Sequence, residues 1–387
     1  MEFRHFGNSN FKVSPLGFGC MRLPTVEENI QGKTSIDEEE AIKMIRYAID
    51  RGVNFIDTAY PYHGGQSEVL VGKALKGGYR KRVKLCTKSP IFKIDHEDDF
   101  ERYLNEQLEK LQVDHVDYYL MHAVNQQNWQ SSIRKFNLLD KAKKAIQEGL
   151  IRQVGFSFHD NERFFREVVD AYPWAMCLVQ YNYLDRDIQA GTGGVQYASQ
   201  KGIAVAVMEP LRGGKLAAPP EPVRQMLDKA APGKPYYEWA LQWLWDQPEI
   251  SVVLSGMNTM DQVKANIEAA DKFKVTGLKT DEKEFLENEV SRKFRELTLV
   301  PCTNCYYCMP CPQGVDIPFN FDMFNNGYVH GELKANRSLY KKIENSAEKC
   351  IACGECEDKC PQNIEISTWM PRVHEVLGED KPYREFK

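Results

Sequence analysis

The chain contains 387 residues, of which 42% are hydrophobic and 27% charged, so it is globular and long enough for one large domain plus a smaller one. Its net charge of −5 and pI near 6.0 exclude the basic surface typical of proteins that bind nucleic acid or anionic membranes. No apolar run reaches membrane-spanning length and the first residues contain no hydrophobic signal core, so we expect a cytoplasmic protein without nucleic-acid or membrane partners.

The chain begins with a predicted hairpin, in which residues 2–6 and 11–14 flank the turn-forming cluster Gly7–Asn10. Apolar β-type runs then alternate with helical patterns. The predicted strands are Leu16–Met21, Val53–Asp57, Val83–Lys88, Val116–Met121, Ile151–Ser157, Met176–Gln180, Ile203–Met208 and Ser251–Ser255. The clearest helices are Asp37–Arg51, Phe100–Leu111 and Leu138–Glu148. Eight alternations predict an α/β fold of the (β/α)₈ TIM-barrel type. An open doubly wound sheet is the alternative, although no G-x-G-x-x-G follows the first strand.

The later part of the chain changes in character. Residues 211–235 are rich in proline and glycine and predict a long loop at the mouth of the barrel. Tyr236–Trp245 is apolar nearly all round, which predicts a helix packed in a core or an interface. We therefore expect a barrel over residues 1–280, a charged connecting helix over 281–297 and a second domain over 298–387.

Eight of the eleven cysteines lie between Cys302 and Cys360. The later run has the spacing C-x₂-C-x₂-C-x₃-C-P of bacterial ferredoxins, in which three thiolates bind one cluster and the fourth binds the other. This rule predicts two 4Fe–4S clusters. The first cysteine set is Cys302, Cys305, Cys308 and Cys360, and the second cysteine set is Cys311, Cys350, Cys353 and Cys356.

Two features of this region depart from the ferredoxin pattern. The first run is one residue short before Cys311, and the spacer from Pro312 to Lys349 is long, with helical patterns at Phe319–Phe324 and Leu339–Ile343. The spacer predicts a mainly helical ferredoxin-like domain. A zinc module with two four-cysteine sites is the alternative, and a cytoplasmic setting disfavours disulfides. The isolated Cys20, Cys86 and Cys177 are interpreted as buried core residues.

Four chemically useful side chains follow three successive predicted strands. They are Asp57, Tyr62, Lys88 and His122. A phenol is a poor proton donor at neutral pH unless a nearby ammonium lowers its pKa, which Lys88 is placed to do for Tyr62. Asp57 would keep Lys88 charged, and His122 would orient a carbonyl group by hydrogen bonding. Singly, each residue has an ordinary structural explanation, but their occurrence at three consecutive strand ends predicts an active site.

These residues carry a resemblance to a known family. The segments Asp57-Thr-Ala-Tyr-Pro-Tyr62, Thr87-Lys88 and Leu120-Met-His122 resemble the aldo/keto reductase signature. The resemblance covers about residues 1–275 and, with the C-terminal cysteines, is closest to the branch that bears a ferredoxin-like domain. It implies a catalytic tetrad of Asp57, Tyr62, Lys88 and His122 in which Tyr62 is the general acid, and a hairpin that closes the bottom of the barrel.

The resemblance also implies NADP(H) or NAD(H) bound across the barrel mouth without a Rossmann fold. Gln180 and Ser157 would bind the nicotinamide carboxamide, and Met208 stands where the family usually has a stacking tyrosine. Ser255 and Asn266 match the adenosine-phosphate segment. Gly256 and Gln262 replace the usual basic residues there. The alternative for this segment is an ordinary helix N-terminus capped by Asn258 or Thr259.

The sequence thus predicts an oxidoreductase that reduces an aldehyde or ketone, or oxidises the alcohol, by hydride transfer. Nicotinamide moves two electrons at once whereas each cluster moves one, so a direct exchange would need a splitter such as a flavin, for which no motif is present. Three hypotheses stay open: a reductase with structural or docking clusters, an enzyme that receives electrons from a ferredoxin-type redox partner, and a non-enzymatic cluster-based redox sensor.

Overall fold

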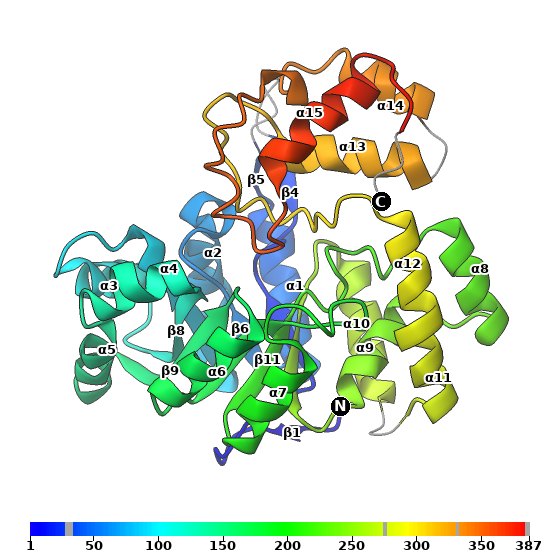
Figure 1. Ribbon diagram of the computed structural model, residues 1–387. Helices are drawn as coiled ribbons and strands as arrows, with labels where there is room; N and C mark the ends of the chain where they lie inside the picture. Colours follow the sequence, from blue (N-terminus) through cyan, green and yellow to red (C-terminus); the bar gives the residue numbers. More distant parts are fainter. Residues whose placement is uncertain (28–33, 274–276, 330–332, 384–387) are drawn as a thin grey trace. The chain divides into compact units, whose positions relative to one another are not determined.

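The computed structural model describes residues 1–27, 34–273, 277–329 and 333–383 (Figure 1). The chain forms two compact units, which we call the barrel unit (residues 1–210 and 238–279) and the cysteine unit (residues 211–237 and 280–387). The limits expected for the sequence domains, at residues 280 and 297, stay predictions. The division into compact units places residues 211–237 together with residues 280–387.

A closed barrel of eight parallel strands forms the barrel unit, in the order β10-β11-β12-β3-β6-β7-β8-β9. The strands are β3 (Leu16–Gly19), β6 (Phe55–Asp57), β7 (Lys84–Ser89), β8 (Val116–Val124), β9 (Ile151–Phe158), β10 (Met176–Gln180), β11 (Ala204–Met208) and β12 (Ile250–Gly256). All eight predicted strands and the barrel itself are therefore confirmed. Because every pair is parallel, all eight strands end at the same rim.

Helices follow the strands and cover the barrel (Figure 1). They are α1 (Glu38–Asp50), α2 (Gln66–Ala74), α3 (Asp99–Leu111), α4 (Gln126–Asn128), α5 (Leu138–Gln147), α6 (Glu162–Ala171), α7 (Gly191–Gln200), α9 (Tyr236–Trp245) and α10 (Met260–Lys272), with short turns η1 (Tyr62–Gly65), η2 (Tyr79–Arg82), η3 (Ile91–Lys93) and η4 (Trp129–Arg134). The three predicted helices are confirmed as α1, α3 and α5. In α9, Trp239, Trp243 and Trp245 are fully buried, as expected for core packing.

The N-terminal hairpin closes the inside of the barrel. Its strands are β1 (Arg4–His5) and β2 (Lys12–Val13). Phe6 and Val13 are buried in one apolar cluster with inward-facing barrel residues. At the turn, Gly7 has φ +53°, and a Cβ there would lie 2.6 Å from the Gly202 carbonyl oxygen, so only glycine allows this close approach. A second hairpin, β4 (Thr25–Glu27) and β5 (Thr34–Ile36), is not predicted by the sequence pattern.

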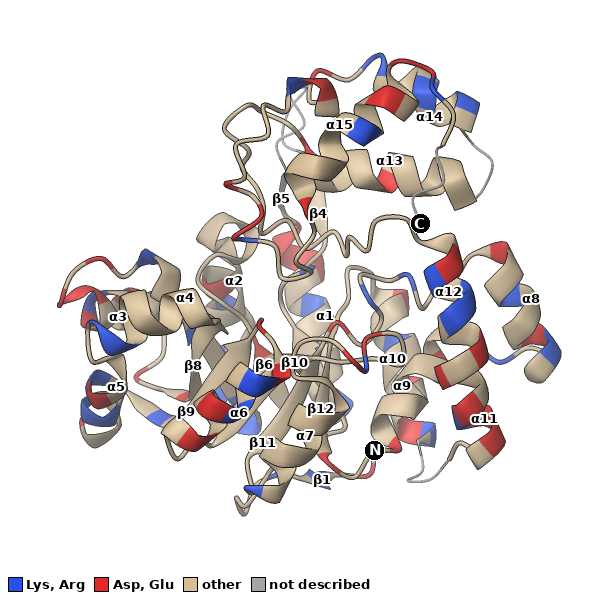
Figure 2. Cartoon of the chain, in the orientation of Figure 1, with Lys and Arg blue, Asp and Glu red and all other residues tan. Residues whose placement is uncertain are grey.

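The cysteine unit is mainly helical. Its elements are α8 (Glu221–Ala230), α11 (Thr280–Glu284), η5 (Phe285–Val290), α12 (Ser291–Leu297), α13 (Ile317–Val329), α14 (Leu333–Tyr340), η6 (Ala347–Lys349) and α15 (Ile366–Leu377). Basic and acidic residues both occur on α8, α11 and α12, as the blue and red parts of the cartoon show (Figure 2). The predicted helix at Leu339–Ile343 is wrong beyond Tyr340, where α14 ends in a turn. The predicted loop 211–235 contains α8, whose Val223 and Leu227 are buried.

A separate apolar core supports the cysteine unit. Phe321 and Phe324 of α13 and Met370, Val373 and Leu377 of α15 are buried in one cluster against which several cysteines pack. In the ranges that the structure describes, no helix is long and apolar enough to cross a membrane.

Candidate functional site

The four predicted catalytic residues come from three neighbouring strands. Asp57 is the last residue of β6, Lys88 lies near the end of β7, and His122 lies near the end of β8. Tyr62 begins η1, five residues after β6 ends. Because β6, β7 and β8 are adjacent and parallel, the structure brings these side chains to one part of the rim.

The Lys88 ammonium is the centre of this group. Its Nζ donates hydrogen bonds to Asp57 Oδ2 at 2.7 Å, to the Thr58 carbonyl oxygen at 2.7 Å and to Tyr62 Oη at 3.2 Å. An ammonium has three protons, so all of them have acceptors in this arrangement. The Lys88 side chain is only 1% exposed, so Asp57 is the counter-charge that makes the buried ammonium tolerable.

His122 faces Tyr62 from the neighbouring strand. Their ring centroids are 6.1 Å apart, with the planes nearly perpendicular. Burial, together with the Lys88 ammonium, lowers the pKa of His122 well below its usual value, so the ring is neutral at pH 7. A neutral imidazole can donate one hydrogen bond, but it does not compete with Tyr62 as the acid that transfers a proton. For Asp57, burial raises the pKa, and the attraction to Lys88 opposes that effect.

A second layer of buried polar groups lies behind Lys88. Gln107 donates from Nε2 to Glu68 Oε1 at 2.6 Å and to the Lys88 carbonyl oxygen at 3.0 Å, while Thr87 donates to the same Glu68 oxygen at 2.6 Å. Tyr119 donates to Gln107 Oε1 at 2.7 Å. Burial raises the pKa of Glu68. The network holds the end of β7 and therefore the direction of Lys88. It was missed because Glu68, Gln107 and Tyr119 are far apart in sequence.

The residues expected to bind the nicotinamide also lie at strand ends. Ser157 is the buried last residue but one of β9 and accepts a hydrogen bond from the Ala123 amide at 2.7 Å. Gln180 and Met208 are the last residues of β10 and β11, and they are paired in register. Ser157 pairs with Leu178 on the other side of β10. The structure therefore brings Ser157, Gln180 and Met208 to neighbouring positions on the rim.

Gln180 is oriented by residues that the sequence patterns do not indicate. Its Nε2 donates to Asp185 Oδ2 at 3.0 Å, and its Oε1 accepts from Gln189 Nε2 at 3.3 Å. Asp185 also accepts from Asn182 Nδ2 at 2.9 Å and is 3% exposed. Because both Nε2 and Oε1 of Gln180 have hydrogen-bond partners, the orientation of its side-chain amide is fixed. A carboxylate five residues beyond a strand end is the one feature of the sequence that could have indicated Asp185.

The expected adenosine-phosphate segment divides into two parts. Asn266 Nδ2 donates to Ser255 Oγ at 2.9 Å, and both side chains are buried. Gly256 and Gln262 are exposed, and Gln262 Oε1 accepts from the Asn258 amide at 2.9 Å. The N-cap of α10 is Thr259, whose hydroxyl accepts from the Gln262 amide at 3.2 Å. The structure thus joins Ser255 to Asn266 and leaves Gln262 at the open end of the helix.

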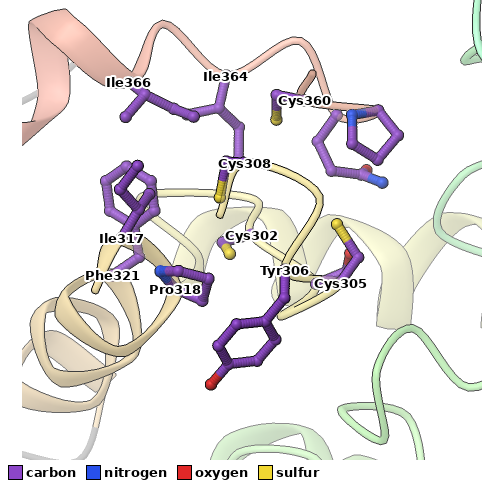
Figure 3. Close-up of a pocket in the computed structure, with 13 residues that line it drawn as sticks. Cys302, Cys305, Tyr306, Cys308, Ile317, Pro318, Phe321, Cys360, Ile364 and Ile366 are labelled. Carbon is purple, nitrogen blue, oxygen red and sulfur yellow. The ribbon is translucent and has the colours of Figure 1, made fainter. Parts of the chain in front are cut away.

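The first cysteine set lies around one cavity in the cysteine unit. The cavity is lined by Cys302, Cys305, Cys308 and Cys360 together with apolar residues of α13 and the segment before α15 (Figure 3). Burial and then the charges of Cys305, Cys302, Cys360 and Cys356 raise the pKa of Cys308. Four soft sulfur donors in an apolar shell are the donor set that iron–sulfur clusters require.

The second cysteine set is less enclosed. Burial raises the pKa of Cys356 to about 11, and Cys350, Glu357 and Cys311 contribute to that shift. Cys353 is exposed, and the Ala352 amide donates to Cys350 Sγ at 3.4 Å. Among the described residues, no group of three His, Cys, Asp or Glu side chains is arranged to hold a single metal ion. The isolated Cys20, Cys86 and Cys177 are buried, as expected.

The buried ion pair gives a first testable prediction. Asp57→Asn should lower the unfolding free energy by roughly 3–5 kcal/mol, because the Lys88 ammonium would stay buried without a carboxylate. Replacing both residues, as Asp57→Asn with Lys88→Met, should recover part of that loss. Urea denaturation checks both, with Asp50→Asn as a control because its pair with Arg82 is exposed. Equal losses for Asp57→Asn and Asp50→Asn would contradict the prediction.

Two buried histidines give a second prediction, on pH. Burial lowers the pKa of His159 to about 4, and the pKa of His122 is also well below its usual value. These two residues therefore bind protons less readily in the folded chain than in the unfolded chain. The contribution of the two neutral histidines to the free energy of unfolding is fully present above about pH 6.5 and is lost as the pH falls towards 4. His159→Asn should therefore reduce the loss of unfolding free energy between pH 6.5 and pH 4 by roughly 3 kcal/mol. The prediction is checked by measuring the free energy of unfolding of wild type and His159→Asn between pH 4 and pH 7. The same pH dependence in both proteins would contradict it.

Comparison with known proteins agrees with the geometry. Residues 15–277 match the Aldo/keto reductase family and residues 301–365 match a 4Fe-4S dicluster domain. The L-galactose dehydrogenase of Arabidopsis thaliana is 30% identical over 72% of this chain and 91% of its own. An uncharacterised oxidoreductase of Bacillus subtilis, YqkF, is 25% identical over 71% of this chain and 93% of its own. The holo form of the aldo-keto reductase AKR11C1 of Bacillus halodurans covers 75% of this chain and 96% of its own, with a TM-score of 0.61 and 26% identity. The chain is thus an oxidoreductase of the aldo/keto reductase family that carries a C-terminal 4Fe–4S dicluster domain.

Proposed function

We propose that the barrel interconverts an aldehyde or ketone and the corresponding alcohol by hydride transfer with NAD(P)H, and that Tyr62 is the general acid. The observation that carries the proposal is the Lys88 ammonium, which is hydrogen bonded to both Asp57 and Tyr62 at the rim of the barrel. A positive charge beside the phenol stabilises the phenolate that remains after the proton leaves. The neutral His122 ring completes the group.

In the reductive direction each residue has a defined task. Tyr62 gives its proton to the carbonyl oxygen as the carbon receives the hydride, and Lys88 stabilises the resulting phenolate. His122 donates a hydrogen bond that orients the carbonyl oxygen towards Tyr62. Asp57 keeps Lys88 charged and in place. The same groups serve the oxidation of an alcohol in reverse, with the Tyr62 phenolate as the base.

The nucleotide supplies the hydride when it is bound. Ser157 and the oriented amide of Gln180 would hold the carboxamide, and Met208 would pack against the nicotinamide ring. Ser255 and Asn266 would contact the adenosine half. Gly256 and Gln262 offer no positive charge to a 2′-phosphate, so these positions do not favour NADP(H) over NAD(H).

The substrate is expected to be a small carbonyl compound or alcohol with an apolar part next to the reacting carbon. Phe92 follows β7 and is 49% exposed, and its ring centroid lies 5.6 Å from that of His122. An exposed aromatic ring beside the catalytic histidine gives the substrate an apolar surface to pack on. The name of the Arabidopsis relative, a dehydrogenase of a sugar, supports the oxidative direction as well.

We further propose that the two cysteine sets hold two 4Fe–4S clusters, which supply one-electron transfer when bound. The second set is the more accessible to a redox partner of the ferredoxin type, because Cys353 is exposed and the neighbouring Ile351 is 64% exposed. A partner of this kind would deliver or remove electrons at the second set.

Tyr62→Phe tests the catalytic role. The variant should lose carbonyl reduction by a factor of about 10²–10⁴, because it keeps the ring but cannot donate a proton. Its affinity for NADPH, followed by protein fluorescence, should be unchanged. Tyr60→Phe is the matched control, since the Tyr60 hydroxyl bonds to Glu106 rather than to Lys88. Comparable activity in wild type and Tyr62→Phe would remove Tyr62 as the general acid.

Iron analysis tests the cluster assignment. Protein purified without oxygen should contain about eight irons per chain, and replacement of Cys305 or Cys353 by serine should each reduce this towards four. Cys177→Ser, which changes a buried cysteine of the barrel unit, should leave the iron content unchanged. Zinc in place of iron, or loss of all iron on replacing either cysteine, would contradict two independent clusters.

A further inference from the structure

The loop that follows β11 reaches the first cysteine set. Lys215 lies in the segment 211–237, which belongs to the cysteine unit, and its Nζ donates a hydrogen bond to the Cys302 carbonyl oxygen at 2.7 Å. A positive charge therefore lies next to one of the four ligands of the first cluster.

Lys215 is held in this position by the turn around it. The Gly214 amide donates to the Leu211 carbonyl oxygen at 3.0 Å, and the Lys215 and Leu216 amides donate to the carbonyl oxygens of Arg212 and Leu211. Gly213 and Gly214 both have positive φ, which allows this tight turn, and Leu216 is fully buried. The backbone on both sides of the lysine is thus constrained.

The Cys302 side of the contact is equally well held. Asn325 of α13 receives a hydrogen bond from the Val300 amide at 3.0 Å and donates one to the Val300 carbonyl oxygen at 2.8 Å. The Cys302 amide in turn donates to the Val300 carbonyl oxygen at 2.8 Å, and the Asn304 amide donates to Cys302 Sγ at 3.5 Å. A fixed charge and a fixed ligand give an electrostatic interaction that does not average out by motion.

We propose that Lys215 acts electrostatically on the first cluster and makes it easier to reduce than it would be without this positive charge. Reduction adds one negative charge to a cluster, and a neighbouring positive charge stabilises the reduced form. The proposal rests on the two clusters proposed above. It goes beyond them by assigning an electronic role to a residue outside the cysteine motifs, which lies seven residues after Met208, the expected nicotinamide contact.

Potentiometric titration followed by low-temperature EPR tests this role. Wild type, Lys215→Met, Lys215→Arg and the control Lys229→Met, which changes an exposed lysine of α8 in the same segment, are titrated anaerobically. In Lys215→Met one midpoint should fall, so that the ratio of reduced to oxidised first cluster at the wild-type midpoint decreases roughly tenfold. The other midpoint, and both midpoints in Lys215→Arg and Lys229→Met, should stay near wild type.

Two results would overturn the proposal. Unchanged midpoints in Lys215→Met with full iron content would show that the charge has no electronic effect. An equal shift of both midpoints would show a general effect of the substitution rather than one on the first cluster. If the wild-type protein itself contains no iron and gives no EPR signal on reduction, the cluster proposal fails instead, and the iron analysis separates that outcome from the other two.

Discussion

The site in the barrel depends on a single buried ammonium. Lys88 is almost inaccessible to water, so it can remain charged only while Asp57 lies beside it, and it can act on Tyr62 only from that position. All three protons of the Lys88 ammonium accordingly have acceptors. The network of Glu68, Gln107 and Tyr119 holds the backbone of β7, and through it the direction in which Lys88 points. An intact buried ion pair adds little net stability, but the loss of one partner is costly because the other charge then stays buried without a counter-charge.

The two cysteine sets differ from the barrel site, and from each other, in their surroundings. In the proposed function they would hold two clusters, and the structure lines a mainly apolar cavity with the first set and leaves Cys353 of the second set exposed. Enclosure and exposure change the reduction potential and the access of a partner in different directions. The two sets are therefore unequal in their surroundings even though their ligands are alike.

The barrel could be predicted because its pattern is local. Each strand is a short apolar run followed by a helical period, and the rim residues follow directly from the strand ends, so Asp57, Lys88 and His122 were found together. Contacts between distant residues were not predictable in this way. Asp185 orients Gln180 although it lies outside the strand, and Lys215 contacts Cys302, which is 87 residues later in the sequence. The helix α8 lies in a segment whose prolines and glycines predicted a loop. The catalytic and binding roles of the individual residues stay predictions.

The placement of residues 211–237 has a consequence for the chain as a whole. This segment is inserted between two strands of the barrel, yet α8 packs against η5 and α12 of the cysteine unit. The cysteine unit is thus discontinuous, and no single cut in the chain separates the two units. Deleting the C-terminal segment would expose the apolar side of α8, including Val223 and Leu227, in the protein that remained. Ending the chain before residue 280 would therefore remove the packing partners of α8, so the barrel unit cannot be obtained by a simple C-terminal truncation without leaving α8 unsupported.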